Sequence, residues 1–193
     1  MRTLVLASTS PYRMQLLRQL ELTFQVAAPQ HQEVLDQEIA PELFVKHQAL
    51  HKALSLRKRY PDALIIGSDQ VFVDARQRMV GKPDSAEGAM SQLMEMSGRR
   101  HTFYTGIAVC DSRSGEQLSE FETFSVTLRK LTKEQVRHYV ERENPIDCAG
   151  SFRVEGLGIA LMEKMEGRDY TALIGLPLIH LVDMLNHFGI DVL

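Results

Sequence analysis

The sequence has little cysteine. Its two cysteines, Cys110 and Cys148, form no closely spaced pair of the kind that holds zinc, and two thiols are too few for a disulfide framework. We therefore expect both to be buried thiols in a reducing compartment.

Long hydrophobic runs are also missing. The first apolar run, residues 3–7, is shorter than a signal peptide requires and meets Ser8 and Pro11 at once. A later apolar segment, residues 172–185, is interrupted by Gly175 and Pro177 and cannot span a bilayer. These features predict a cytoplasmic protein that has no membrane partner.

An excess of positive charge is absent as well. The net charge is -3 in a chain of 193 residues, which argues against a general binder of nucleic acid or anionic membranes. The hydrophobic share of 44% and the charged share of 24% are ordinary for a globular protein. The length suffices for one large domain or two small lobes around a shared sheet.

The order of predicted elements indicates a mixed α/β fold. Apolar or alternating runs predict strands at residues 3–7, 24–28, 63–73, 101–111 and 121–131, the last two forming a hairpin-like pair. Capping residues and apolar spacing predict helices that open at Ser10-Pro11, Pro41, Ser85, Thr132 and Pro177. Residues 150–161, rich in glycine, are expected to form a strand or turn.

The common phosphate-binding motifs are missing too. There is no Walker-type loop, no dinucleotide fingerprint and no His-Glu-x-x-His zinc pattern. What remains are four polar groups in apolar surroundings. The first is residues 8–13, where a strand ends and a helix begins; free amides there suit a phosphate, and Arg13 adds charged donors. A capped helix with a surface arginine explains this segment too.

The second polar group, residues 67–70, ends an apolar strand with Asp69, a carboxylate able to hold a cation or accept a proton. A turn aspartate is an equal alternative. The third group is Lys52 and Lys82, which suit phosphate, together with Glu33 as a second metal-seeking carboxylate. Each of these taken alone fits a solvated surface charge.

The fourth polar group is residues 150–156, in which flanking glycines allow close approach of a ligand and Arg153 and Glu155 share one side of an extended chain. A turn without function explains it equally well.

Together these segments resemble the Maf family. The resemblance runs in order through essentially the whole chain: residues 6–13 (LASTSPYR), Glu33, Lys52, 66–70 (IGSDQ), 81–83 (GKP), 103–106 (FYTG), 148–152 (CAGSF), 166–169 (EGRD) and 173–178 (LIGLPL). It implies a mixed, elongated, twisted sheet flanked by helices. The fold would be Maf-like and inosine-triphosphatase-like, one domain over residues 1–193 with two lobes and a cleft, often as a homodimer.

The resemblance also implies an enzyme that hydrolyses a nucleoside triphosphate to the monophosphate and pyrophosphate with magnesium or manganese. Asp69 matches the family's proton acceptor, and as a carboxylate it is expected either to accept the proton or to hold the metal together with Glu33. Matches to the phosphate-handling positions are found at Ser8, Arg13, Lys52 and Lys82. Met14 stands where the family usually has a second arginine, and Gln32 replaces an acidic residue.

Three positions favour the branch of the family that acts on 7-methyl-GTP, namely Tyr12, Gln70 and Glu155. A carboxylate accepts both the N1–H and the amine of guanine, whereas an amide suits uracil better. N7-methylation makes the base cationic, so a face on Tyr12 adds a cation–π term of about 0.5–2 kcal/mol.

Two other functions are compatible with this resemblance. One is a pyrimidine (dTTP or UTP) or broad-specificity pyrophosphatase of the same family. The other is a non-catalytic nucleotide-binding regulator of cell division, which the joint presence of Asp69, Glu33 and the two lysines disfavours.

Overall fold

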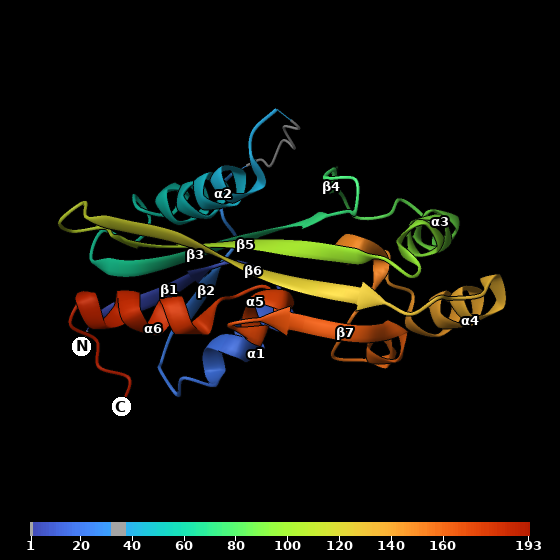
Figure 1. Ribbon diagram of the computed structural model, residues 1–193. Coiled ribbons are helices and arrows are strands. Elements are labelled where there is room, and N and C mark those ends of the chain that lie inside the picture. Colours follow the sequence, from blue (N-terminus) through green and yellow to red (C-terminus); the bar gives the residue numbers. More distant parts are fainter. Residues whose placement is uncertain (1, 32–37) are drawn as a thin grey trace. The chain divides into compact units, whose positions relative to one another are not determined.

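The computed structural model describes residues 2–31 and 38–193. They form a mixed sheet with strand order β2-β1-β3-β5-β6-β7, and β4 pairs with β3 (Figure 1). The strands are β1 (Thr3–Ala7), β2 (Gln25–Ala27), β3 (Ala63–Val73), β4 (Met79–Val80), β5 (Arg100–Asp111), β6 (Gln117–Leu128) and β7 (Met162–Gly167). The helices are α1 (Pro11–Arg18), α2 (Pro41–Ser55), α3 (Ala86–Met96), α4 (Lys133–Glu143), α5 (Tyr170–Ile174) and α6 (Leu178–His187), with 3-10 turns η1 (Ala149–Ser151) and η2 (Leu157–Leu161).

This arrangement confirms the predicted mixed α/β class. The strands β1 and β3 have the predicted bounds, and the expected caps at Ser10, Ser85 and Thr132 are present, the last as a full capping box. The predicted hairpin-like pair corresponds to β5 and β6, which are neighbours in the sheet. The strand expected at residues 24–28 is shorter, and the helix that opens at Pro41 ends at Ser55.

The chain divides into two compact units. Unit 1 contains residues 1–70, 104–122 and 169–193, and unit 2 contains residues 71–103 and 123–168. The chain passes from one unit into the other within β3, β5 and β6.

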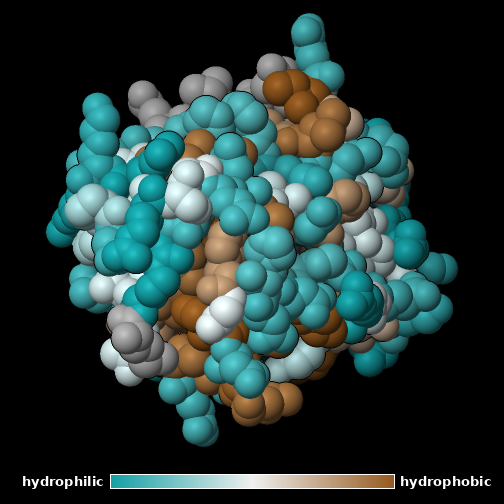
Figure 2. All heavy atoms as spheres, turned by 90° about the vertical axis from the view of Figure 1, so that its left-hand side faces the viewer, coloured by the Kyte–Doolittle hydropathy of each residue, from teal (hydrophilic) through white to brown (hydrophobic). Residues whose placement is uncertain are grey.

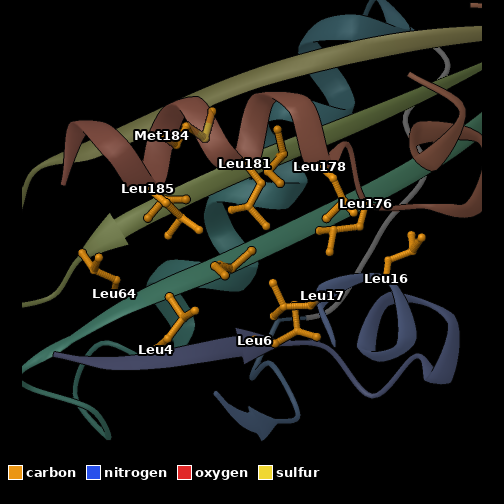
Figure 3. Close-up of a cluster of buried hydrophobic side chains, with 13 residues drawn as sticks. Leu4, Leu6, Leu16, Leu17, Leu64, Leu176, Leu178, Leu181, Met184 and Leu185 are labelled. Carbon is orange, nitrogen blue, oxygen red and sulfur yellow. The ribbon is translucent and has the colours of Figure 1, made fainter. Parts of the chain in front are cut away.

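In unit 1 the sheet is apolar on both faces. Strands β1, β2 and β3 are parallel, and alternate side chains of β1 enter different core clusters. Leu4 and Leu6 pack with α1 and α6, where Leu17, Leu181 and Leu185 meet them (Figure 3). Val5 and Ala7 face the opposite cluster, to which α2 contributes Ala53. Helices thus cover both faces, which explains why β1 and the first residues of β3 are continuous apolar runs.

The buried face of α2 does not include all residues that fit helical apolar spacing. Leu43 is 62% exposed and His47 is exposed, although both fit helical apolar spacing. The residues buried instead are Phe44, Val45, Gln48, Ala49, Lys52 and Ala53. The helix therefore presents two polar side chains, Gln48 and Lys52, to the protein interior.

In unit 2, α3 and α4 pack together, and the alternating residues Phe124, Val126 and Leu128 of β6 are buried, as expected. The edge strand β7 pairs antiparallel with β6. Among the described residues, no helix is both long and apolar enough to cross a membrane. On the face shown in Figure 2, most of the visible surface is hydrophilic, with apolar side chains in small groups.

Candidate active site

The first polar group of unit 1 lies where β1 ends and α1 begins. Ser8 is only 4% exposed, and its Oγ accepts the backbone N–H of Ser10 at 3.1 Å. Ser10 is the N-cap of α1, accepting from the Arg13 backbone N–H at 3.4 Å, and Pro11 occupies the first turn. The predicted helix start is confirmed, and the side-chain oxygens of Ser8 and Ser10 accept the backbone N–H groups of Ser10 and Arg13 there.

The central feature of unit 1 is a buried ion pair. The Lys52 Nζ lies 2.6 Å from the Asp69 Oδ1, and the residues are 5% and 4% exposed. The Lys52 ammonium also donates to the Ser68 carbonyl oxygen at 3.5 Å. Charged groups are rarely buried unless they are paired and hydrogen-bonded, so this pair is a structured element of the interior.

Two glycines let α2 bring Lys52 to Asp69. A Cβ on Gly67 would lie 2.0 Å from the Ala49 carbonyl oxygen, and one on Gly106 would lie 2.1 Å from the Val45 carbonyl oxygen. The backbone of α2 therefore rests directly on β3 and β5. Because Lys52 is one turn beyond Gln48 on the buried face, this close packing places its ammonium at the strand residue Asp69.

Arg13 is held by the turn that follows α5. Its Nε donates to the Gly175 carbonyl oxygen at 2.8 Å. The same oxygen accepts the Ser68 hydroxyl at 2.8 Å, and that hydroxyl also lies 2.8 Å from the Gly106 carbonyl oxygen. Ser68 is fully buried and precedes Asp69 directly, so a single carbonyl links the Arg13 guanidinium to the strand that carries the carboxylate.

Gln70 also contacts the α5 region. Its side-chain nitrogen donates to the Thr105 hydroxyl at 3.0 Å and to the carbonyl oxygens of Ala172 at 2.8 Å and Leu173 at 3.0 Å. These contacts give Gln70 a part in fixing α5. Its predicted part in base specificity stays a prediction.

The remaining candidates of unit 1 lie on α1. Tyr12 is half-buried, and Met14 packs against the core cluster of α1 and α6. The apolar environment of Met14 explains why methionine is accommodated at this position. Glu33 and the neighbouring Gln32 lie outside the described residues.

In unit 2, Lys82 is exposed in the segment between β4 and α3. Gln92 of α3 connects that segment to the glycine-rich segment. The Gln92 side chain donates to the Gly81 carbonyl oxygen at 3.3 Å, and its Oε1 accepts the Ser151 hydroxyl at 2.5 Å. Gly150 and Ser151 both have positive φ, 75° and 61°. Such a conformation is costly for serine and is frequent at functional sites.

Glu155 is exposed, but the segment around it is anchored to α4. The Arg153 guanidinium donates to the Glu143 carboxylate and to its carbonyl oxygen, and the other Glu143 carboxylate oxygen accepts the Leu157 backbone N–H at 3.1 Å. The Arg153 backbone N–H donates to the Tyr139 hydroxyl at 3.0 Å. Burial raises the pKa of that phenol to about 12. Residues 153–157 thus form an anchored turn, which was one of the two structures expected for residues 150–161.

Sequence reasoning missed Glu143, Tyr139 and Gln92, which hold these turns. Their side chains read as ordinary positions of amphipathic helices, and nothing in their spacing marks a contact with a distant loop. For Tyr139, its place on the apolar face of α4 beside Val136 and Val140 was the one available signal.

Three histidines also gather in unit 1, although they look scattered in the sequence. The rings of His47 and His51, one helical turn apart on α2, have centroids 4.0 Å apart, and His31 lies 5.4 Å from His51. Burial, and then the charges of His47 and His31, lowers the pKa of His51. The spacing of four residues on one helix was the signal for this contact.

The residues suited to a metal ion are carboxylates. Within residues 2–31 and 38–193, no three His, Cys, Asp or Glu side chains are grouped to hold an ion. Asp69 supplies one oxygen donor of the kind that magnesium prefers. Its predicted partner Glu33 belongs to the segment outside those two ranges. The donor chemistry at Asp69 therefore fits a hard divalent cation that needs at least one further ligand.

The fold and the residues of unit 1 are typical of an α/β protein that binds a phosphorylated ligand. Strand β1 leads into a capped helix start, and the same unit holds an anchored arginine and a buried Lys–Asp pair. These groups suit a phosphorylated ligand and a proton transfer. The prediction that Asp69 ends its strand is wrong, because β3 continues past it to Val73.

Comparison with known proteins identifies the family. The model described as "Maf-like protein" matches residues 3–188, so the chain belongs to the Maf family. A protein of Syntrophotalea carbinolica named 7-methyl-GTP pyrophosphatase is 68% identical over 193 residues, covering 100% of this chain and 98% of its own. One of Colwellia psychrerythraea with the same name is 45% identical over 193 residues, covering 100% and 96%. The Staphylococcus aureus Ham1 protein shares 14% identity at a TM-score of 0.47, over 67% of this chain and 73% of its own.

Proposed function

We propose that this protein hydrolyses 7-methyl-GTP to 7-methyl-GMP and pyrophosphate. The relative of 68% identity, matched over the whole chain, is named for this activity. The single structural observation that supports the chemistry is the buried pair of Lys52 and Asp69 at 2.6 Å. It lies in the same unit as the Arg13 guanidinium and the α1 start.

In the proposed reaction, a water molecule attacks the α-phosphorus in line with the bond to the β-phosphate. The new oxygen–phosphorus bond forms, the α–β anhydride bond breaks, and pyrophosphate leaves with the electron pair. The Asp69 carboxylate accepts the proton of the attacking water. The Lys52 ammonium donates a hydrogen bond to the Oδ1 of that carboxylate and supplies positive charge beside it.

Arg13, Ser8 and the α1 amides are proposed to bind the phosphate oxygens. Charge that develops on the leaving pyrophosphate is stabilised by donors fixed before the reaction. Arg13 is fixed in this way, since its Nε is bonded to Gly175. In unit 2, Lys82 is proposed to contribute to phosphate binding and Glu155 to base recognition, and their exposure leaves both side chains accessible to a ligand.

A magnesium or manganese ion is proposed to be held by Asp69 and Glu33. When bound, such an ion neutralises phosphate charge and polarises phosphorus. The protein is further proposed to be cytoplasmic and homodimeric; sedimentation of the purified chain tests the dimer.

The test is pyrophosphate release from a panel of nucleotides, with magnesium and with manganese. Methylated and plain GTP, dTTP and UTP are compared at equal concentrations. The proposal predicts the highest kcat/KM for 7-methyl-GTP, by roughly tenfold over GTP, since a cation–π term of about 1.4 kcal/mol corresponds to one decade. Preference for dTTP or UTP would point to the pyrimidine branch, and binding without pyrophosphate release to a non-catalytic role.

A further inference from the structure

The turn between α5 and α6 is organised by two buried residues outside the predicted site. Asp169 and Thr171 are 3% and 5% exposed. The Asp169 Oδ1 accepts the Thr171 backbone N–H at 2.9 Å and the Thr171 hydroxyl at 2.5 Å. The Asp169 Oδ2 accepts the Ile179 backbone N–H at 3.0 Å. One carboxylate therefore joins the start of α5 to the start of α6.

Thr171 closes the same turn from inside. Its hydroxyl oxygen accepts the Leu178 backbone N–H at 2.9 Å. Its carbonyl oxygen accepts the backbone N–H groups of Gly175 at 3.0 Å and Leu176 at 3.1 Å. Hydrogen bonds within residues 169–179 thus converge on Thr171 and Asp169.

The turn presents a single carbonyl to the candidate active site. Gly175 has φ of 122°, which favours glycine, and its carbonyl oxygen accepts from Arg13 Nε and from Ser68 Oγ, both at 2.8 Å. A carbonyl oxygen has two lone pairs, so these two donors use its capacity. The bond to Nε fixes the direction of one N–H of the guanidinium and so restricts where its two terminal nitrogens point.

From this geometry we infer that Asp169 and Thr171 are positioning residues for Arg13: by holding the Gly175 carbonyl in place, they aim the guanidinium at the phosphate groups of the substrate. This inference rests on the proposed function, because Arg13 must bind phosphate for its direction to matter. Neither Asp169 nor Thr171 touches substrate in this role.

The test is a double-mutant cycle on kcat/KM for 7-methyl-GTP with Thr171→Val and Arg13→Ala. Valine keeps the shape of threonine but removes the hydroxyl that joins Asp169 to the Leu178 N–H. Thr171→Val is expected to lower kcat/KM by roughly 10- to 100-fold, the range in which displaced positioning groups act. Thr171→Ser, which keeps the hydroxyl, is expected to restore the rate to within about threefold. Exposed Thr23→Val is the control and should behave as wild type.

The double variant separates positioning from general support. If Thr171 acts through Arg13, adding Thr171→Val to Arg13→Ala lowers kcat/KM by no more than about twofold, since the group it aims is already gone. Losses that multiply would overturn the inference while leaving Arg13 in its proposed role. If Arg13→Ala alone keeps the wild-type rate, the proposed phosphate role of Arg13 itself fails.

A second variant covers the case in which Thr171→Val does not fold at the assay temperature. Asp169→Asn keeps one acceptor oxygen for Thr171 but replaces the acceptor of the Ile179 N–H with an amide nitrogen. The double-mutant cycle is then made with Asp169→Asn and Arg13→Ala. A further loss of no more than about twofold in the double variant supports positioning, and losses that multiply overturn it. Binding of 7-methylguanosine, which carries no phosphate, should stay within about twofold of wild type, and a parallel loss there would also contradict positioning of a phosphate ligand.

Discussion

Three candidate residues of unit 1 and two of unit 2 lie in opposite environments. In unit 1, Ser8, Lys52 and Asp69 are each 5% exposed or less and are hydrogen-bonded within the protein. In unit 2, Lys82 and Glu155 are exposed, while the turns that carry them are anchored by Gln92 and Glu143. Under the proposed function, the two units therefore have different roles: the buried residues of unit 1 take part in the reaction, and the exposed residues of unit 2 contribute to binding of the substrate.

This comparison predicts different kinetic effects. Groups fixed before the reaction stabilise the transition state, so their loss lowers kcat. Groups that contact the substrate equally before and during the reaction change KM and leave kcat nearly unaltered.

The largest expected effect tests the packing that places Lys52. Gly67→Ala puts a methyl group 2.0 Å from the Ala49 carbonyl oxygen and 2.9 Å from the Ala53 nitrogen, both backbone atoms of α2. We expect a loss of about 3 kcal/mol or more in the free energy of unfolding, measured with urea. Gly81→Ala is the control, because a Cβ there meets nothing within 4 Å. Equal stability of the two variants would contradict the close contact of α2 with β3.

The next largest expected effect is on kcat and tests the Lys52–Asp69 ion pair. Lys52→Met leaves the Asp69 carboxylate buried without this cation, and we expect kcat to fall about 100-fold or more. Lys58, exposed beyond the end of α2, provides the matched control Lys58→Met, expected to leave the rate unchanged. Raised KM with normal kcat in Lys52→Met would show that unit 1 contributes uniform substrate binding, the role expected of unit 2.

A smaller effect concerns the stability of unit 1 in acid. The guanidinium of Arg2 forms a two-point contact with Asp111 and holds the pKa of that carboxyl well below its usual range. A carboxyl pKa depressed by folding stabilises the protein above the unfolded value of about 4, and this contribution is lost as the pH falls through the folded value. Asp111→Asn should therefore cost about 1.5–3 kcal/mol at pH 7.

The pH dependence of that cost is the measurement. The difference in free energy of unfolding between wild type and Asp111→Asn should shrink as the pH is lowered from about 5 to about 2. In unit 2, Glu141 pairs with Arg137 at the surface, with side chains 56% and 57% exposed. Glu141→Gln should cost no more than about 0.5 kcal/mol at any pH, since exposed pairs contribute little. A difference in free energy of unfolding for Asp111→Asn that stays constant over this pH range would contradict the Arg2–Asp111 pairing.

The smallest effect belongs to unit 2. Glu155→Gln should raise KM for 7-methyl-GTP about tenfold, which corresponds to about 1.4 kcal/mol, and leave kcat within about twofold. Exposed Glu163→Gln on β7 is the control. A fall in kcat without a change in KM would remove the distinction between the units.

The parts of the fold predicted from sequence are those with local causes. Ser10 with Pro11, and Thr132 with Gln135, specify helix starts within four residues, and the apolar run of β3 specifies its own strand. Helix α5 and strand β7 were missed. The five residues of α5 are too few to show a period, and β7 (MEKMEG) is largely exposed and lacks alternation.

The site shows the same limit. A capped helix start with an arginine, and an aspartate within an apolar strand, were recognisable from local sequence, and the family resemblance joined them to the lysines. Burial of Lys52 could not be predicted, because lysine is normally exposed and its position depends on backbone contacts at Gly67 and Gly106. The role of the Gly175 carbonyl is likewise a property of the folded turn, with no signal in residue type beyond the glycine itself.

The most direct test of the central claim, that the buried carboxylate of unit 1 carries out the chemistry, compares binding and turnover in one variant. Asp69→Asn and the exposed control Asp183→Asn are measured for 7-methyl-GTP affinity by calorimetry and for pyrophosphate release. We predict that Asp69→Asn binds within about fivefold of wild type and loses at least about 100-fold in kcat, as removal of a general base requires. Normal turnover in Asp69→Asn, or turnover that falls only as binding falls, would contradict it.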